Sequence, residues 1–153
     1  MRKGYTLAEM LIVTTIVLIL ALISMASLVN RRNQGSLTAT TATMAGLLRE
    51  AQSRSVSQAS FTTWGVHFEN ATSPFFALFD NVYATSTHSG YYALPAWVDY
   101  ATSSIAQGSW AEVSFAQISG IARGYSSIKI YLLRSNPVIS STISVASSGA
   151  VSY

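Results

Sequence analysis

The sequence predicts an α+β fold in which one long N-terminal helix packs against an antiparallel β-sheet. Two observations lead to this prediction. Apolar residues fill the start of the chain and then recur at helical spacing as far as about Ser57. After Ser60 they alternate with polar residues, which is the period of a strand. Because the helix comes first and all the strands follow it, the order is that of an α+β protein.

The first part of the predicted helix has the length and composition of a membrane span. Met10 to Val29 contains no charged residue, and a helix of about 20 residues rises about 30 Å, enough to cross the hydrocarbon core of a bilayer. Glu9 stands at the near end of this apolar run. A carboxylate in lipid costs roughly 2.5–3.5 kcal/mol on insertion scales, so acids in such positions usually have a function.

The second part of the predicted helix is amphipathic. Its apolar residues recur near helical spacing, and Arg49, Glu50, Gln52 and Arg54 take the other side. The apolar members are Leu37, Met44, Leu47, Leu48 and Ala51, with Val56 a little beyond. Gly35 and the run Thr38 to Thr43 are poor helix formers, so we expect a bend or a locally weak stretch of helix near Asn33 to Ser36.

Several strands are expected after the helix. Trp64, Val66 and Phe68 alternate with Thr63, Gly65 and His67, which predicts a strand half exposed to water. Further strands are expected at 75–79, 91–94, 97–100, 110–115 and 128–133, and a C-terminal hairpin is expected around Ser148-Gly149. Gly120 to Gly124 is expected to be a turn between strands.

Composition excludes several kinds of site. The chain of 153 residues has no cysteine, so disulfides, thiolate metal sites and cysteine nucleophiles are excluded. The formal charge is +3, which falls to +1 without Arg2 and Lys3, and no Lys or Arg follows Arg134. Because nucleic-acid binding depends on cationic contacts to phosphates, we do not expect a nucleic acid as partner.

No catalytic or metal-binding constellation is evident in the sequence. His67 is interpreted as an ordinary strand residue and His88 as a solvated loop residue. The acids Glu69, Asp80, Asp99 and Glu112 are scattered without the spacing of a calcium loop. We therefore expect no enzyme activity, no cofactor and no metal. Five aromatic residues could form a binding patch, but a core or its rim is the favoured interpretation: Tyr91, Tyr92, Trp97, Tyr100 and Trp110.

The N-terminus resembles a known processing signal. Gly4-Tyr5-Thr6-Leu7-Ala8-Glu9, with a short basic leader before it and Met10-Leu11-Ile12-Val13 after it, resembles the type III signal of type IV prepilins and type II secretion pseudopilins. The resemblance implies that a prepilin peptidase cuts between Gly4 and Tyr5 and methylates Tyr5. It also implies that Glu9 guides filament assembly. Tyr5 replaces the commoner phenylalanine but keeps an aromatic ring.

The resemblance extends more loosely to the rest of the chain. The stretch Leu47 to Arg54 running into Phe61 to Phe68, and the closing segments 143–145 and 148–151, look like minor pseudopilins of the H type. Many major pilins have a C-terminal disulfide loop, which this chain cannot form. The implied role is a minor pilin or pseudopilin of a type IV pilus-like or type II secretion filament.

The resemblance also implies a division of the chain, a location and partners. Residues 1–4 would be a cleaved leader, 5–30 the transmembrane or filament-core half of the helix, 31–58 its amphipathic half, and 59–153 a β-rich head. The head would lie outside the cytoplasm on a single-pass inner-membrane anchor, and later in a periplasmic or cell-surface filament. Implied partners are other pilin subunits, the prepilin peptidase, the inner-membrane assembly platform and, before assembly, the lipid bilayer. The membrane and filament helix would use Met10, Leu11, Ile12, Val13, Ile16, Leu20 and Ile23.

Two other functions share the membrane helix. One is a membrane-tethered binding module, such as an adhesin for glycans, that never polymerises and so needs neither Gly4 nor Glu9. The other is an anchored enzyme, which would need a convergent polar site that the sequence does not reveal.

Overall fold

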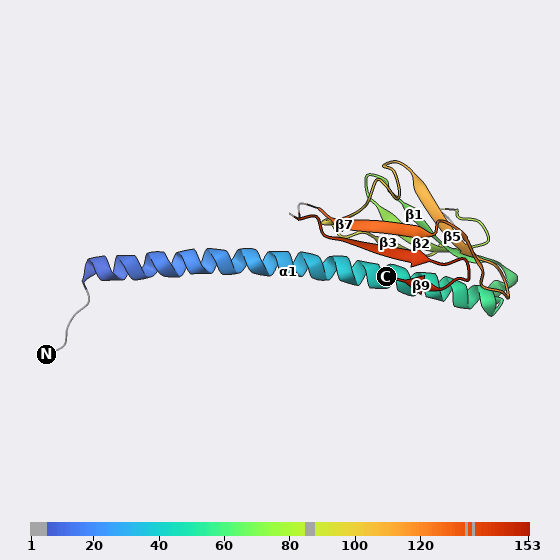
Figure 1. Ribbon diagram of the computed structural model, residues 1–153, viewed down its shortest axis with the longest axis horizontal. Coiled ribbons are helices and arrows are strands. Elements are labelled where there is room, and N and C mark those ends of the chain that lie inside the picture. Colours follow the sequence, from blue (N-terminus) through green and yellow to red (C-terminus); the bar gives the residue numbers. More distant parts are fainter. Residues whose placement is uncertain (1–5, 85–87, 134, 136) are drawn as a thin grey trace. The chain divides into compact units, whose positions relative to one another are not determined.

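The computed structural model describes residues 6–84, 88–133, 135 and 137–153, and it has the predicted α+β layout (Figure 1). The long helix α1 spans Leu7–Val56 and is followed by a short 3-10 helix, η1, at Ala59–Phe61. The strands come after it and form two antiparallel sheets. The predicted order of one N-terminal helix and then antiparallel strands is therefore confirmed.

The helix α1 includes Asn33 to Ser36, where a bend or a locally weak stretch was expected. The threonines that follow satisfy their own hydroxyl groups. Thr40, Thr41 and Thr43 each donate to the carbonyl four residues earlier, at 2.8, 2.8 and 2.9 Å. Such bonds let threonine remain inside a helix without an unpaired hydroxyl. The chain nevertheless divides into two compact units, one ending at Gln34 and the other spanning Gly35–Tyr153. From here on this second unit is called the head, so the head now includes the part of α1 from Gly35 onward as well as the strands.

Within the head, the predicted apolar stripe of α1 forms one wall of the core. The side chains of Met44, Leu48 and Ala51 are fully buried, and Leu37 and Leu47 are nearly so. They pack in one cluster with side chains from both sheets. Val56 was expected to continue this stripe, but it is 46% exposed because the helix ends there.

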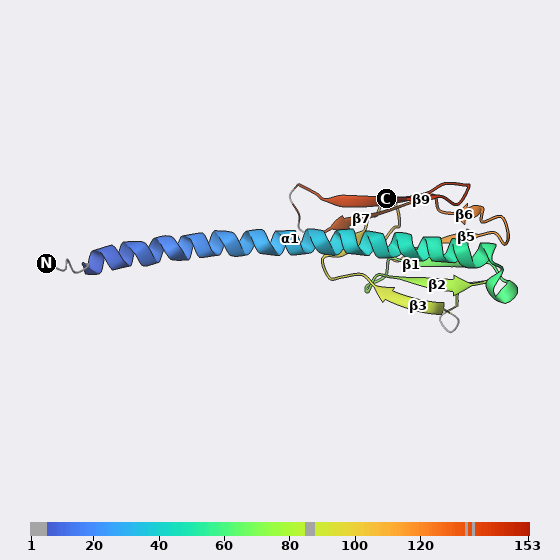
Figure 2. The same cartoon turned by 90° about the horizontal axis from the view of Figure 1, so that it is seen from below.

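The strands form a five-stranded and a four-stranded sheet. The first sheet, in the order β3-β2-β1-β5-β6, consists of His88–Ala93, Phe75–Asp80, Trp64–Glu69, Trp110–Phe115 and Ala122–Gly124. The second, in the order β4-β7-β8-β9, consists of Val98–Tyr100, Ser127–Leu132, Ser140–Val145 and Val151–Ser152. Figure 2 shows β2 and β3 on one side of α1, and β7 and β9 on the other. The predicted C-terminal hairpin is confirmed, because β8 pairs with β9.

The strand β1 departs from its prediction of being half exposed to water. Trp64 to Phe68 are all buried, because β1 lies in the middle of its sheet between β2 and β5. Its outward face is covered as well. A Cβ atom on Gly65 would lie 2.7 Å from both Phe79 Cζ and the Val113 carbonyl oxygen, so only glycine leaves room for the Phe79 ring there.

The segment Gly120 to Gly124 is not simply a turn. Ala122–Gly124 forms the edge strand β6, which pairs with β5 in the register Val113↔Gly124 and Phe115↔Ala122. Gly124 has φ +101°, a conformation that favours glycine. The end of β6 therefore has the positive φ that is common in turns, as expected for this segment.

Candidate functional site

The N-terminal end of α1 is built around Thr6 and Glu9. The backbone N–H of Glu9 donates to the Thr6 hydroxyl at 3.3 Å, and the N–H of Met10 donates to the Thr6 carbonyl at 3.2 Å. The Thr6 side chain therefore caps the Glu9 N–H, one of the donors that a helix start leaves unpaired, and the Thr6 carbonyl accepts the first bond within the helix. Glu9 lies in the first turn, where the positive end of the helix dipole favours an anion.

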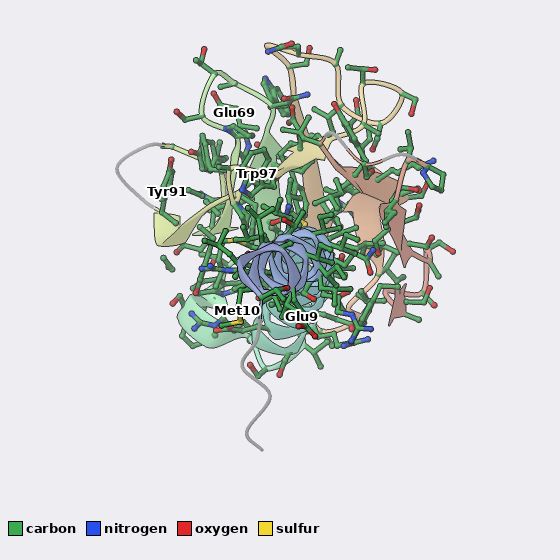
Figure 3. All side chains as sticks on the ribbon, turned by 90° about the vertical axis from the view of Figure 1, so that its left-hand side faces the viewer. Glu9, Met10, Glu69, Tyr91 and Trp97 are labelled. Carbon is green, nitrogen blue, oxygen red and sulfur yellow. The ribbon has the colours of Figure 1, made fainter. Side chains whose placement is uncertain are left out.

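The helix after Glu9 is apolar and uncovered. Leu7–Met25 is long and apolar enough to cross a membrane, with a mean hydropathy of 2.5, and none of it is buried within the described structure. All seven residues predicted for the membrane or filament helix are at least half exposed: Met10, Leu11, Ile12, Val13, Ile16, Leu20 and Ile23. Glu9 and Met10 both project from the beginning of this segment (Figure 3). Such a surface needs a lipid or protein partner to leave water.

The hydroxyl groups inside the apolar segment are paired within the helix. Thr14 and Thr15 both donate to the Leu11 carbonyl, at 3.0 and 2.8 Å, and Ser24 donates to the Leu20 carbonyl at 2.9 Å. Because bilayer hydrocarbon offers no hydrogen-bond partners, this internal pairing makes the three residues compatible with a membrane span.

The predicted cleavage and methylation site, Gly4 and Tyr5, lies outside the described residues. Thr6, the first residue that the structure describes, follows Tyr5 directly in the sequence. Cleavage after Gly4 and methylation of Tyr5 therefore stay predictions, as does the assembly role of Glu9.

In the head, the outer face of β1 holds a buried histidine between two acids. The Nδ1 atom of His67 lies 2.9 Å from Glu112 Oε1 on β5, and Nε2 lies 3.4 Å from Glu69 Oε2. The His67 side chain is only 4% exposed, whereas the two carboxylates are about one-third exposed. A carboxylate can only accept a hydrogen bond, so a nitrogen bonded to one must carry hydrogen.

Aromatic rings cover the imidazole. The Tyr83 ring stacks on it at 3.6 Å between centroids with an angle of 3°, and Trp110 stacks at 5.7 Å. Burial raises the pKa of the Tyr83 hydroxyl, and the Glu69, Tyr91 and Glu112 charges raise it further. The phenol therefore stays neutral over a wider range of pH beside these acids. Together these residues connect β1, β5 and the loop after β2.

The five aromatic residues singled out from the sequence do not form one patch. Tyr100 is fully buried in the core, and its hydroxyl donates to the Phe75 carbonyl at 2.9 Å. The other four are 41–58% exposed. The Tyr91 ring lies tilted against Phe75 and the Tyr92 ring stacks on Phe76, and these two phenylalanines are neighbours on opposite faces of β2. Tyr91 and Trp97 also lie apart in Figure 3.

Two features of these sites escaped the sequence prediction. The spacing Thr6-x-x-Glu9 before an apolar run is the signature of a capping box and could have identified the helix start. The cluster around His67 left no comparable signal, because Glu112 lies 45 positions away in the sequence. Within the part of the chain that the structure describes, no three His, Cys, Asp or Glu residues are grouped to hold a metal ion.

Comparison with known proteins gives one match. Residues 1–25 match the family model described as the prokaryotic N-terminal methylation motif. No curated protein and no solved structure matches the chain. The match covers Glu9 and the apolar segment up to Met25.

Proposed function

We propose that this chain, whose N-terminal methylation motif is the signature of type IV pilins and pseudopilins, is a structural subunit of a pilus-like or type II secretion filament. The motif supports a pilin-like precursor that a prepilin peptidase processes. The minor-pilin or minor-pseudopilin role is the finer part of the proposal. In this role the chain is a structural subunit and not an enzyme.

The observation that carries the proposal is the position of Glu9 at the start of an uncovered apolar helix. Before assembly, lipid would cover Leu7–Met25, which is consistent with a single-pass membrane anchor. After assembly, the helices of neighbouring subunits would cover the same surface. Head-to-tail contacts that do not close produce an open helical polymer. The inner-membrane assembly platform would drive this transfer.

Glu9 would set the register of the polymer. Its carboxylate would pair with the α-amino group of Tyr5 on an adjacent subunit, once the leader has been removed between Gly4 and Tyr5. Leaving one partner of a buried ion pair unmatched costs roughly 3–5 kcal/mol. A subunit placed out of register would pay this cost, so correct stacking is favoured.

Substituting Glu9 tests the proposal directly. Glu9→Ala should be inserted and processed like the unmodified chain but should enter filaments poorly, because the register contact is lost. The measurement is the amount of subunit in sheared filaments relative to the membrane fraction. Glu50→Ala is the matched control, since Glu50 lies on the same helix and pairs with Arg54 in its own chain. Normal incorporation of Glu9→Ala would contradict the register role.

Mass spectrometry of the mature N-terminus tests the processing step. The expected product begins at Tyr5 with a methylated amino group. Gly4→Ala should block this maturation and, with it, function. A Gly4→Ala variant that functions normally would instead favour a tethered binding module that does not polymerise.

A further inference from the structure

The head presents exposed apolar side chains at the end where α1 terminates. Val56 is 46% exposed, Phe61 85%, Ile118 68% and Ile121 49%. Figures 1 and 2 both show the end of α1 and the loop from β5 to β6 at this end of the head. The two are joined, because the Ile118 N–H donates to the Ser55 carbonyl at 3.2 Å. These four residues are here called the apolar tip, and none of them is charged.

The backbone at the apolar tip is held in an unfavourable conformation. Gln58, Ser60, Phe61 and Ile118 have φ values of +57°, +58°, +54° and +65°, although none is glycine. For a β-branched residue such as Ile118, positive φ is a genuine outlier. The neighbouring Thr62 hydroxyl is buried, and no described residue pairs with it. Strain of this kind persists at sites where it serves binding or another function.

A groove lies elsewhere on the same head, between α1 and the end of β3. It has a volume of about 220 Å³, and no charged side chain lines it. Phe76 and Tyr92 are stacked at 5.4 Å between ring centroids on one side, and Ala39, Thr40 and Pro95 are among the other lining residues. Thr40 and Val56 are about 24 Å apart along α1, given a rise of about 1.5 Å per residue. A single head therefore cannot fill its own groove with its own tip.

We propose that the apolar tip of one subunit docks in the groove of a second copy of this chain, with the Phe61 ring packing beside Phe76 and Tyr92. Three observations favour a second copy as occupant. The tip protrudes and the groove is hollow, neither contains a charge, and they lie toward opposite ends of the helix segment within one head. An apolar projection that fits a pocket elsewhere on the same molecule gives a repeating contact that does not close. The inference rests on the proposed filament function and adds to it a specific contact between heads.

Disulfide trapping tests the contact. Because the chain contains no cysteine, only the introduced cysteines can form disulfides. The full chain carrying Phe61→Cys and Ala93→Cys is expressed in cells, and its filaments are oxidised. Ala93 lines the groove and is exposed. Two cysteines are bridged only when their Cα atoms are within about 7 Å. Ala93 pairs with Phe75, which lies opposite Glu69 at the far end of β1. Phe61 comes three residues before Trp64, and the five residue steps from Trp64 to Glu69 span about 17 Å, so a bond within one subunit is excluded. The expected result is a ladder of covalent dimers, trimers and longer chains.

Two controls complete the test. Phe61→Cys paired with Thr142→Cys, an exposed position on β8, should give at least tenfold less ladder. Phe61→Ser should reduce the amount of filament several-fold while leaving the melting temperature of the head unchanged, because Phe61 contributes nothing to the core. Filaments without a ladder, or an equal ladder from both cysteine pairs, would overturn the docking contact alone. Absence of filaments and of processing in the unmodified chain would overturn the proposed function as well.

Discussion

At the residue scale, His67 shows how a polar side chain is accommodated under an aromatic cover. Its ring is buried beneath Tyr83, yet Glu112 and Glu69 face its two nitrogens from sides that remain partly open to water. Burying a polar group without partners is costly, and a carboxylate oxygen lies within 3.4 Å of each ring nitrogen here. We interpret the arrangement as stabilising the outer face of β1, and its geometry does not point to a catalytic role.

Removing the Glu112 carboxylate should therefore destabilise the head. Glu112→Ala leaves the His67 Nδ1 atom buried without its partner at 2.9 Å, and the expected loss is about 1–3 kcal/mol. Glu112→Gln retains an acceptor oxygen and should recover most of this loss. Thermal unfolding of the detergent-solubilised full chain measures the difference. Equal melting temperatures for the two variants would show that the hydrogen bond contributes nothing.

Tyr100 gives the head a dependence on alkaline pH. Burial, and then the neighbouring Asp99 charge, raise the pKa of the Tyr100 hydroxyl well above its usual value. The unfolded chain loses this proton near pH 10, whereas the folded chain retains it. The stabilising effect is thus complete below about pH 10 and is lost as the pH rises through the folded-state pKa.

The melting temperature of the unmodified chain should therefore fall above about pH 10, and the melting temperature of Tyr100→Phe should fall less steeply. At neutral pH, Tyr100→Phe should be less stable by about 1 kcal/mol, because it loses the hydrogen bond to the Phe75 carbonyl. Melting curves of both proteins between pH 8 and pH 11 check the two effects together. Parallel pH profiles would contradict the assignment to Tyr100.

At the element scale, β1 is the strand around which the first sheet is organised. It pairs with β2 over Trp64↔Asp80 to Glu69↔Phe75, and with β5 over Trp64↔Phe115 to Glu69↔Trp110. Ser55 connects it to the end of α1, because the Trp64 N–H donates to the Ser55 hydroxyl at 2.8 Å. A change in β1 therefore affects the helix and both neighbouring strands.

Two glycine-to-alanine substitutions should have opposite effects. In Gly65→Ala the added methyl group meets Phe79 and the Val113 carbonyl, and we expect a loss of about 3 kcal/mol. In Gly46→Ala the methyl group meets nothing within 4 Å, and the helix interior should gain about 0.5–1 kcal/mol. Denaturant unfolding compares the two variants directly. Stability of Gly65→Ala at or above that of the unmodified chain would show that β1 is not closely covered.

At the scale of the whole molecule, one helix serves two environments. Up to Gln34 the described helix belongs to a unit whose large apolar side chains, where the structure describes them, are exposed, and from Gly35 onward it belongs to the head. Within the head its buried face contacts both sheets. The same helix therefore packs against a core of its own chain only in the second unit.

Leucines in the two parts of α1 should respond differently to the same change. Leu48→Ala opens a cavity beside a fully buried position and should cost the head about 2–5 kcal/mol. Leu20→Ala, at a side chain that is 58% exposed, should leave unfolding of the head unchanged. Near-ultraviolet circular dichroism follows the tryptophans and tyrosines of the head during heating. A similar shift for both variants would mean that the two units unfold together.

The helix, most of the strands and the N-terminal motif could be predicted from the order of residues alone, because each depends on residues that are close together in the chain. Helical spacing identified Leu48 and Ala51 as core residues, and alternation placed β1. Three features emerged only from the folded chain: β1 is buried on both faces, His67 lies between Glu69 and Glu112, and 122–124 pairs as β6. The periodicity of apolar residues indicates that one face of a helix or strand is buried. Burial of the other face depends on segments that are distant in the sequence. The exposure of Val56 could not be predicted for the same reason, since it depends on whether segments distant in the sequence cover the last turn of α1.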